Sequence, residues 1–504
     1  MVFNSAVFVF FFVIVYCVYW SLSYLSDARR LQNRFLLFAS YVFYGWWDWV
    51  FLGLIVISTV VDYFSARGMM TSAAAPGTRR RRALLLISIC MNLGMLATFK
   101  YFDFFISSFL ETARLFDPAA MSGAESQLLL QVILPVGISF YTFQTMSYTI
   151  DVYRGTIDAE KNFLDFGLFV SFFPQLVAGP IERAGDLMPQ FKTERKFDWD
   201  DVQAGAWFIL FGFFMKVYVA DSIAPLVDQV YLENKFVYEA NPALAAGHGG
   251  AQVLLASIAF AFQIFGDFAG YSTIALGAAR LLGIRLTINF ETPEYSQNPA
   301  ELWRRWHTTL NRWVTDYVYF PLGGSKFGVL NKYRNLLIAF LLTGLWHGAN
   351  WTFVLWGAFM GVWVMAYDLT RPYLPVMPER WPGAVKTAVR ISKMIFVFSM
   401  FGVSATLFRA YDIQHSVELW KSLLNFPWEF GQSVNGVSSA GTLLGAILQK
   451  ILLLVVLDGV WYYSRDPLWI HKRSTALRAA VYTVLFFMVL VYGVFGKDVI
   501  YFAF

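Results

Sequence analysis

Charged residues are scarce in this chain of 504 residues. Asp, Glu, Lys and Arg make up 14% of the sequence, whereas a typical soluble domain has about 25%. Hydrophobic residues make up 58%, and apolar runs near the ~20 residues that span a bilayer recur along the whole length. These features exclude an ordinary soluble domain, and the strand alternation of an outer-membrane barrel is missing too. We therefore expect an all-α polytopic membrane protein with about 11–12 transmembrane helices.

Cysteine and histidine are rare as well. The two cysteines, Cys17 and Cys90, both lie in apolar runs, so neither a disulfide framework nor a cysteine metal site is indicated. Of the five histidines, His248, His415 and His471 lie in expected loops without metal-ligand spacing. The sequence also lacks a glycine-rich phosphate loop and a Gly-x-Ser-x-Gly motif. Its net charge of +5 comes from basic residues dispersed between the spans, which argues against nucleic-acid binding.

Basic residues mark the loops that we expect on the cytoplasmic side. The run Arg79–Arg82 is the strongest such marker. In residues 226–249 and 410–440 the charged side chains are mainly acidic, so these two loops are expected outside. We interpret residues 3–24 as a retained first span, because no small-residue cleavage site follows them. No long polar linker divides the chain, so residues 1–504 are expected to form a single membrane-embedded domain.

Two apolar stretches are interrupted by proline and glycine. Residues 163–181 contain Pro174, Gly179 and Pro180, and residues 313–324 end in Tyr-Phe-Pro-Leu-Gly-Gly. Such interruptions predict short or re-entrant elements rather than plain spans. Irregular backbone at membrane depth is tolerated where protein or a water-filled cavity surrounds it. The two stretches therefore predict a central cavity or tunnel that opens toward the cytoplasm, flanked by short re-entrant and amphipathic helices.

Residues 301–313 form a dense aromatic segment that carries His307. Its apolar side chains recur at spacings of three and four and so share one helix face: Leu302, Trp303, Trp306, Leu310 and Trp313. We expect a continuous helix at the membrane surface, with arginines facing water and His307 at the border of the apolar face. A structural role is equally open, because His307 alone would also suit a bond to a headgroup or a backbone carbonyl.

A second histidine, His347, lies inside the apolar run of residues 343–351. An ionisable group there is a functional hypothesis by default, because hydrocarbon penalises it. The alternative is a core histidine whose hydrogen bonds are satisfied between two tryptophans. Two histidines near one membrane, one at its rim and one inside, indicate chemistry within the bilayer.

Residues 250–282 form a long apolar run with polar groups in its middle. Gly266 and Gly270 make a small-residue pair, for which close helix packing is the preferred interpretation. Asp267 and Tyr271 share a face at a spacing of four, and a carboxylate inside a span needs a partner or a cavity.

A histidine inside a membrane can relay protons, bind metal or act as the base in acyl transfer. Metal binding is weakly indicated, because no Cys, His and Asp cluster has ligand spacing. A transporter is the rival class, and it would be expected to show two similar halves with broken helices in corresponding positions. Here both broken stretches lie in the middle of the chain, so the residues favour an enzyme, with a transporter as the alternative.

Matching stretches spread over most of the chain identify a family: residues 35–46, 134–144, 151–154, 173–183, 267–272, 301–324, 345–348 and 500–504. Among them are Phe-Pro-Gln-Leu-Val-Ala-Gly-Pro-Ile-Glu-Arg at 173–183 and Leu-Trp-His-Gly at 345–348. Together they resemble the membrane-bound O-acyltransferase family, and closely its bacterial alginate O-acetyltransferase branch. In that family, the usual invariant histidine corresponds to His347, and a second polar position, Asn or His, corresponds to His307.

The resemblance implies acetyl-CoA as a cytoplasmic donor substrate, with no bound cofactor and no metal. It implies a multi-pass protein of the bacterial inner membrane that contacts membrane lipid. Its expected partners are a periplasmic hydrolase-like acetyltransferase and polysaccharide biosynthesis proteins, and nucleic acid is not among them. Alginate is the first expected acceptor polymer, and relatives that modify cellulose, peptidoglycan or teichoic acid leave those alternatives open.

The same resemblance assigns roles to individual residues. His347 would be the general base on the acceptor hydroxyl, and a transient acyl-histidine stays open. Asp267, Tyr271 and Trp346 would orient that histidine or line the tunnel. Basic and polar side chains on the cytoplasmic side would hold the phosphates of the donor, although ordinary surface solvation and inward orientation explain any single one of them better: Arg304, Arg305, Asn311, Lys326, Lys332 and Arg334.

Overall fold

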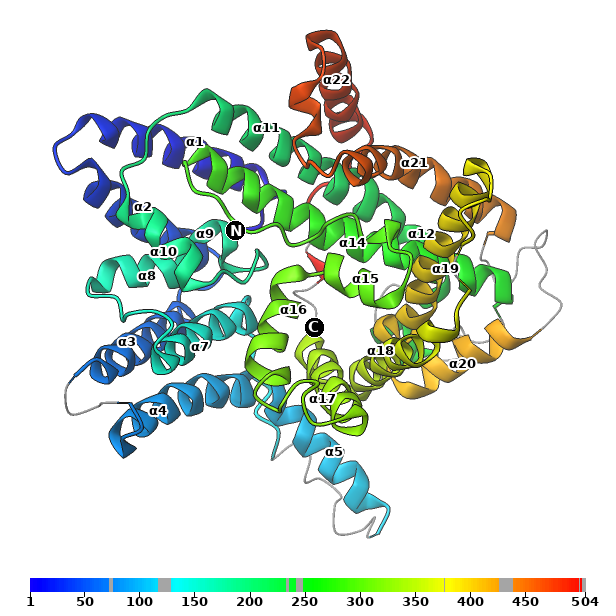
Figure 1. Cartoon of the computed structure of the whole chain (residues 1–504), viewed down its shortest axis with the longest axis horizontal. Coiled ribbons are helices and arrows are strands. Elements are labelled where there is room, and N and C mark those ends of the chain that lie inside the picture. Colours follow the sequence, from blue (N-terminus) through cyan, green and yellow to red (C-terminus); the bar gives the residue numbers. More distant parts are fainter. Residues whose placement is uncertain are drawn as a thin grey trace.

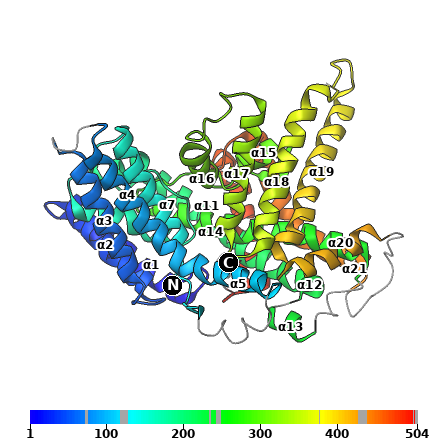
Figure 2. The same ribbon diagram turned by 90° about the horizontal axis from the view of Figure 1, so that it is seen from below.

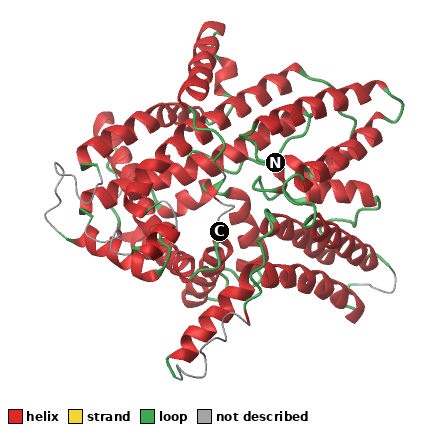
Figure 3. Cartoon of the chain, turned by 180° about the vertical axis from the view of Figure 1, so that it is seen from behind, coloured by secondary structure: helices red, strands yellow, loops and turns green. Residues whose placement is uncertain are grey.

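The computed structural model describes residues 1–71, 76–116, 128–232, 235–241, 248–375, 377–425, 438–497 and 499–500. Within these ranges every regular element is helical, and Figure 3 shows helices joined by loops with no strand in the part of the chain that is described. The expected all-α architecture is confirmed. Parts of the expected outer loops, at 117–127, 242–247 and 426–437, lie outside the described residues, as does most of the matching stretch at 500–504.

Nine helical stretches in the described residues are long and apolar enough to cross a membrane. They are Ala6–Tyr24, Leu52–Met69, Arg79–Arg114, Trp199–Ala240, Gly250–Leu281, Trp351–Tyr373, Gly383–Arg409, Ala440–Ser464 and Thr475–Tyr492. Three further helices have similar lengths but more polar sequences: α2 (Ala28–Gly45), α7 (Ile138–Arg154) and α17 (Val329–His347). The chain is thus a multi-pass membrane protein, and the count of 11–12 spans stays a prediction.

The first part of the chain forms a layer of tilted helices on one side of the molecule (Figure 2). It contains α1 (Ala6–Ser21), η1 (Leu22–Tyr24), α2, α3 (Leu52–Met69), α4 (Arg79–Leu96), η3 (Ala97–Tyr101), α5 (Phe102–Arg114) and α7. Helices α3, α4 and α7 meet around the fully buried Asp62, whose carboxylate accepts hydrogen bonds from Ser88 Oγ (2.5 Å) and Asn92 Nδ2 (2.9 Å). This polar cluster joins three helices inside the apolar layer.

Helix α14 (Gly250–Leu281) is the central element, next to α11 (Trp199–Phe213) in Figure 1. The two backbones come close because glycines face each other. A Cβ added at Gly212 would lie 2.7 Å from the carbonyl oxygen of Gly270, and one added at Gly277 would lie 2.6 Å from that of Gly205. Gly266 packs in the same way against the carbonyl of Met215. The packing interpretation of Gly266 and Gly270 is confirmed.

The proline-rich stretch at 163–181 is broken and buried as predicted. It folds into α8 (Phe163–Ser171) and the single turn α9 (Phe173–Leu176), followed by loop residues that are buried up to position 182. Gly179 is required there, because a Cβ would lie 2.4 Å from the Cα of Gln175. The second broken stretch contains the π-helical turn η7 (Thr315–Tyr319) and ends in a turn beyond it, where Gly323 and Gly324 adopt positive φ angles.

The expected continuous helix over residues 301–313 is wrong. The chain forms two short helices, α15 (Pro299–Arg305) and α16 (Thr308–Val314), which are separated at Trp306 and His307. His307 has a φ of 45°, in the left-handed region that ends a helix. Asn311 Nδ2 donates to the carbonyls of Trp303 (2.6 Å) and Trp306 (2.5 Å), which the break leaves without helical partners. The break turns His307 inward, to 1% exposure, instead of leaving it at the membrane rim.

The remaining helices complete the bundle: α10 (Ala184–Lys192), η4 (Phe214–Ala220), α12 (Asp221–Tyr231), α13 (Lys235–Ala240), η6 (Pro293–Tyr295), α18 (Trp351–Thr370), η8 (Arg371–Tyr373), α19 (Gly383–Arg409), α20 (Ile413–Leu424), α21 (Ala440–Ser464), η9 (Trp469–Lys472) and α22 (Thr475–Tyr492). In Figure 2 the N-terminus, α13 and α20 lie toward one end, and the α18–α19 connection lies at the opposite end. These two ends match the loops expected outside and inside, respectively.

Candidate active site

His347 is the last residue of α17 and is 3% exposed. Its helix is held close to α18 by two glycines, because a Cβ at Gly344 would lie 2.3 Å from the carbonyl oxygen of Phe353. Aromatic rings surround the imidazole: Trp346 (5.0 Å between ring centroids), Trp356 (5.1 Å) and Phe408 (5.1 Å). The histidine is therefore rigidly placed at a helix end within a mostly apolar environment.

His307 occupies the break between α15 and α16 and is held by the loop that precedes them. Its Nδ1 lies 3.0 Å from Asn289 Oδ1, which also accepts a hydrogen bond from Thr309 Oγ1 at 2.9 Å. Because an amide oxygen only accepts, Nδ1 carries the proton and Nε2 carries the lone pair. No hydrogen-bond partner for Nε2 occurs among the described residues. Asn289 thus fixes the orientation and tautomer of His307, a role that the sequence did not reveal.

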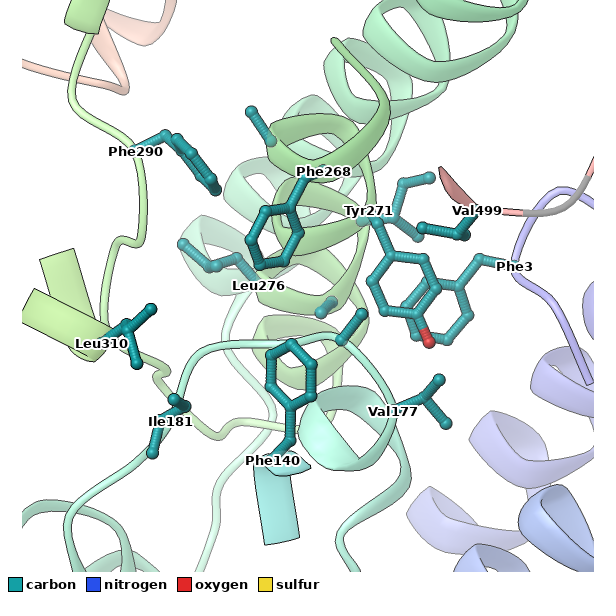
Figure 4. Packing of buried hydrophobic residues seen from close by; sticks show 14 of the residues in the cluster. Phe3, Phe140, Val177, Ile181, Phe268, Tyr271, Leu276, Phe290, Leu310 and Val499 are labelled. Atoms are coloured by element: carbon teal, nitrogen blue, oxygen red, sulfur yellow. The ribbon is translucent and has the colours of Figure 1, made fainter. Parts of the chain in front are cut away.

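Both histidines contact the ring of Trp346. Its ring meets His307 edge-on at a centroid distance of 5.5 Å and His347 at 5.0 Å. Phe268 also meets His307 edge-on, at 4.7 Å, and Figure 4 shows Phe268 and Phe140 in the apolar packing that encloses this region. The structure therefore brings both predicted histidines and Trp346 together in one cluster.

A small cavity adjoins His347. It has a volume of about 30 Å³, enough for a water molecule. It is lined by Lys100, residues 134–140, Val177, Trp346 and His347. A larger pocket of about 580 Å³ shares Leu134, Val136 and Val177 with it and extends to Met1 and Trp46, at the end of the molecule that carries the N-terminus. His347 is thus close to a route from the face expected outside, and His307 does not line this cavity.

A second pocket, of about 490 Å³, approaches from the other side. Its lining includes Arg304 and Arg312 at α15 and α16, and it reaches Thr343 in α17. Thr343 precedes His347 by four residues, so it lies one helical turn away on the same face. Two arginines at the mouth suit an anionic ligand that enters from the face expected inside. Asn311, predicted to bind the donor, lines this pocket while it bridges the two short helices.

Lys100 and Tyr101 hold the end of α17, and the sequence interpretation missed both. Lys100 Nζ donates to the carbonyls of Trp346 (2.7 Å) and His347 (3.4 Å), and Tyr101 Oη donates to that of Leu345 (3.1 Å). The signal was present, because Lys100 is an ionisable residue within a long apolar run, the same criterion that singled out His347.

Asp267 has a partner, as its position inside a span predicts, and the role of Asp267 and Tyr271 in orienting His347 or lining the tunnel stays a prediction. The Asp267 carboxylate accepts from Lys216 Nζ (2.5 Å) and from the backbone N–H of Ile500 (2.9 Å), so it is engaged by a cation and the C-terminal segment rather than by His347. Lys216 also binds Asp221 at 2.8 Å. The ring of Tyr271 stacks on the ring of Phe3 (Figure 4), and their centroids are 4.3 Å apart. These two residues tie the central helix to both ends of the chain.

Arg305 is likewise committed within the protein. Its guanidinium pairs with Glu301 at 3.0 Å, donates to the carbonyl of Glu291 at 3.0 Å and lies over the ring of Tyr462 at 5.0 Å. Lys332 pairs with Asp368. Of the predicted donor-binding arginines, Arg304 therefore lines the inner pocket, while Arg305, the last residue of α15, pairs within that helix.

Glu182 secures the loop that carries Asn289. Its carboxylate accepts from the backbone N–H of Thr287 (2.5 Å) and from Thr287 Oγ1 (3.0 Å). Burial raises the pKa of Glu182 to about 7, although the two hydrogen bonds lower it. One residue before Glu182, the N–H of Ile181 donates to Thr309 Oγ1 at 3.1 Å. The re-entrant segment and the His307 loop are therefore joined through Thr287 and Thr309.

This arrangement suits proton transfer. In the part of the chain that is described, no three His, Cys, Asp or Glu side chains are grouped to hold a metal ion. A neutral histidine beside a small cavity, with pockets on either side, can take a proton from a group delivered from one face while a donor enters from the other.

Residues 157–408 match the model of the membrane-bound O-acyltransferase family. The chain belongs to this family and is a membrane-bound O-acyltransferase. It is similar to the probable alginate O-acetylase AlgI of Azotobacter vinelandii, with 37% identity over 93% of this chain and 87% of the relative. It is also similar to the probable alginate O-acetylase AlgI of Pseudomonas aeruginosa (36%; 93% and 83%) and to the peptidoglycan O-acetyltransferase of Helicobacter pylori (31%; 87% and 81%).

Proposed function

We propose that this protein takes the acetyl group of cytoplasmic acetyl-CoA and passes it across the bacterial inner membrane for O-acetylation of an exopolysaccharide, with alginate as the polymer. The names of the most similar relatives support the polymer and the acetyl group. One observation carries the proposal: His347 lines a cavity that adjoins the outer pocket, and it lies one helical turn from the inner pocket at Thr343.

The donor would bind from the cytoplasm. Acetyl-CoA is polyanionic and cannot cross hydrocarbon, so its phosphates stay at the inner face while its acyl end enters the protein. Arg304 and Arg312 at the mouth of the inner pocket would pair with those phosphates. The pocket leads toward Thr343, so the thioester would lie on the side of α17 that also carries His347.

The acceptor would come from the outer face. A periplasmic hydrolase-like acetyltransferase would present a hydroxyl at the outer pocket and later pass the acetyl group to the polysaccharide. His347 takes the hydroxyl proton while the oxygen attacks the thioester carbon, and the carbonyl becomes an oxyanion. Its collapse breaks the C–S bond, and the leaving sulfur takes the proton from His347, which yields the ester and CoA–SH.

Free CoA release tests this assignment. Purified protein in nanodiscs is supplied with acetyl-CoA, and thiol release is followed with and without the periplasmic partner. His347→Ala should lower the rate by about 10²–10⁴-fold, the usual contribution of a general base. His471→Ala serves as the control and should match the wild type, because His471 lines none of the three pockets described above. Wild-type activity in a folded His347→Ala variant would contradict the mechanism.

Peptidoglycan is the second candidate polymer. The relative from Helicobacter pylori is named a peptidoglycan O-acetyltransferase, and its alignment covers 87% of this chain. The acetyl content of alginate and of peptidoglycan, measured in cells with and without the protein, distinguishes the two. Loss of acetyl groups from peptidoglycan alone would reject alginate and leave the acyltransferase chemistry in place.

A further inference from the structure

Lys100 is the cation closest to the reaction centre that the proposed mechanism leaves unused. It lies in η3, a π-helical turn between α4 and α5, inside the long apolar stretch Arg79–Arg114. Its side chain lines the same cavity as His347. A π-helical turn within a helix often marks a functional site, because it displaces side chains from the regular helical positions. Lys100 lies outside the segment matched by the family model, residues 157–408.

The hydrogen bonds of Lys100 fix its ammonium group at the end of α17. Nζ donates to the carbonyls of Trp346 and His347, at 2.7 and 3.4 Å. A lysine ammonium has three N–H donors, so these two bonds leave one for a further acceptor. Because the side chain also lines the cavity, an oxygen bound there is within its reach.

A protonated Lys100 would have no local counter-charge. No carboxylate lies within ion-pair distance of Nζ among the described residues. A cation is favoured at a helix C-terminus, where the carbonyl ends carry partial negative charge. The partial charges of the α17 carbonyls compensate only part of the lysine charge. A full negative charge that forms in the cavity would stabilise the lysine more strongly, because the low dielectric constant of the interior strengthens the attraction.

We propose that Lys100 is a catalytic residue that stabilises the oxyanion of the acyl-transfer intermediate. The proposal rests on the function proposed above. When His347 takes the proton of the acceptor hydroxyl and the C–O bond forms, the thioester carbonyl oxygen gains the negative charge. The Lys100 ammonium donates its remaining N–H to that oxygen. When the C–S bond breaks, the C=O bond re-forms and the leaving sulfur receives the proton from His347, while Lys100 keeps all of its protons.

The competing explanation is purely structural, with Lys100 as a cap for the α17 carbonyls. Tyr101→Phe provides a matched control, because it removes the neighbouring cap on the Leu345 carbonyl and Tyr101 does not line the cavity. Lys100→Gln removes the charge but keeps an N–H₂ donor for the carbonyls. Lys100→Arg keeps the charge.

The experiment measures kcat and KM for acetyl-CoA by free-CoA release in nanodiscs, together with the melting temperature. Lys100→Gln is expected to lose about 10²–10³-fold in kcat with little change in KM, the usual effect of removing an oxyanion donor. Lys100→Arg should recover part of the rate, and Tyr101→Phe, which removes a cap but no charge, should lose far less of the rate than Lys100→Gln. If Lys100→Gln is not recovered as folded protein, Lys100→Met replaces it in the same comparison.

Two outcomes overturn the proposal. The first is a folded Lys100→Gln variant with wild-type kcat. The second is an equal loss of rate in Lys100→Gln, Lys100→Arg and Tyr101→Phe, with the loss in each variant proportional to the decrease in its melting temperature. His347→Ala, measured alongside, separates this proposal from the function on which it rests. If His347→Ala is inactive while Lys100→Gln is fully active, only the role of Lys100 fails; if His347→Ala is active, the proposed function fails.

Discussion

At the scale of single residues, the two histidines are held in different ways. His347 is packed among aromatic rings and lines the cavity. His307 is oriented by Asn289 and contacts the ring of Trp346. This difference explains why we assign the general base to His347. His307 is placed to orient the cluster or to extend a hydrogen-bond path through its Nε2.

Asn289→Ala tests the link between Asn289 and His307. Without the amide oxygen, His307 Nδ1 loses its acceptor and the ring its fixed orientation. We expect Asn289→Ala and His307→Ala each to reduce acetyl transfer by roughly ten- to a hundredfold, as for other groups that orient a functional histidine. The double variant should transfer acetyl groups as fast as the less active of the two single variants, because both changes disrupt the same interaction.

Ser272→Ala is the control for this pair, because it removes only the 3.3 Å hydrogen bond that Asn289 Nδ2 donates to Ser272 Oγ. It should leave the rate nearly unchanged. Multiplicative losses in the Asn289→Ala/His307→Ala double variant would show that the two residues act independently. Total loss in His307→Ala, equal to that in His347→Ala, would show instead that the two histidines work as one coupled unit.

At the scale of elements, the active site depends on how closely helices approach. Helices α17 and α18 pack through Gly344 and Gly357, and His347 follows Gly344 by three residues. The end of α17 is then held from the other side by Lys100 and Tyr101 of η3. The position of His347 is therefore set by contacts of α17 with its neighbour α18 and with η3, which lies more than 200 residues earlier in the chain.

Gly344→Ala should displace α17 from α18. The added Cβ would lie 2.3 Å from the Phe353 carbonyl oxygen, so the helices must separate. We expect a stability loss of about 1–3 kcal/mol from overpacking, with a clear loss of activity. Gly94→Ala in α4 is the matched control, since nothing lies within 4 Å of its new Cβ. That variant should be neutral or gain up to about 1 kcal/mol from helix propensity. Melting temperature and CoA release check both; an unaffected Gly344→Ala variant would show that the α17–α18 contact does not position His347.

At the scale of the whole molecule, two pockets approach α17 from opposite ends. The inner pocket contains Arg304 and Arg312, and the outer pocket extends to Met1 and Trp46. Figure 2 places the N-terminus with α13 and α20 at one end, away from the α18–α19 connection. The proposed passage of an acetyl group across the membrane depends on which of these ends faces the cytoplasm.

Cysteine labelling tests the orientation. In a variant without Cys17 and Cys90, an impermeant maleimide should label Ala240→Cys, in α13, on intact spheroplasts. Thr71→Cys, which follows α3 on the side of the Arg79–Arg82 run, should be labelled only after the membrane is permeabilised. Both positions are exposed in the structure, so accessibility within the protein is matched. The reverse pattern would invert the topology and with it the assignment of donor and acceptor faces.

The sequence by itself determined the membrane class and the helical architecture, and it singled out His307 and His347 as the candidate functional histidines. Composition and the length of apolar runs are sufficient for the first two, because hydrocarbon demands apolar side chains and internally bonded backbone. His347 was detectable because an ionisable group in an apolar run is costly. The broken stretch at 163–181 was equally readable from its prolines and glycines.

Tertiary structure alone decided how these parts meet. The apolar spacing of residues 301–313 fits one continuous helix as well as two short ones, and the break depends on Asn311, which bonds the freed carbonyls, and on Asn289, which holds His307. Asp267 is paired with Lys216, which lies 51 positions earlier in the chain, and Lys100 reaches carbonyls 246 and 247 positions away. Such pairings arise because a buried polar group must find a partner wherever packing supplies one, and local sequence carries no record of that choice.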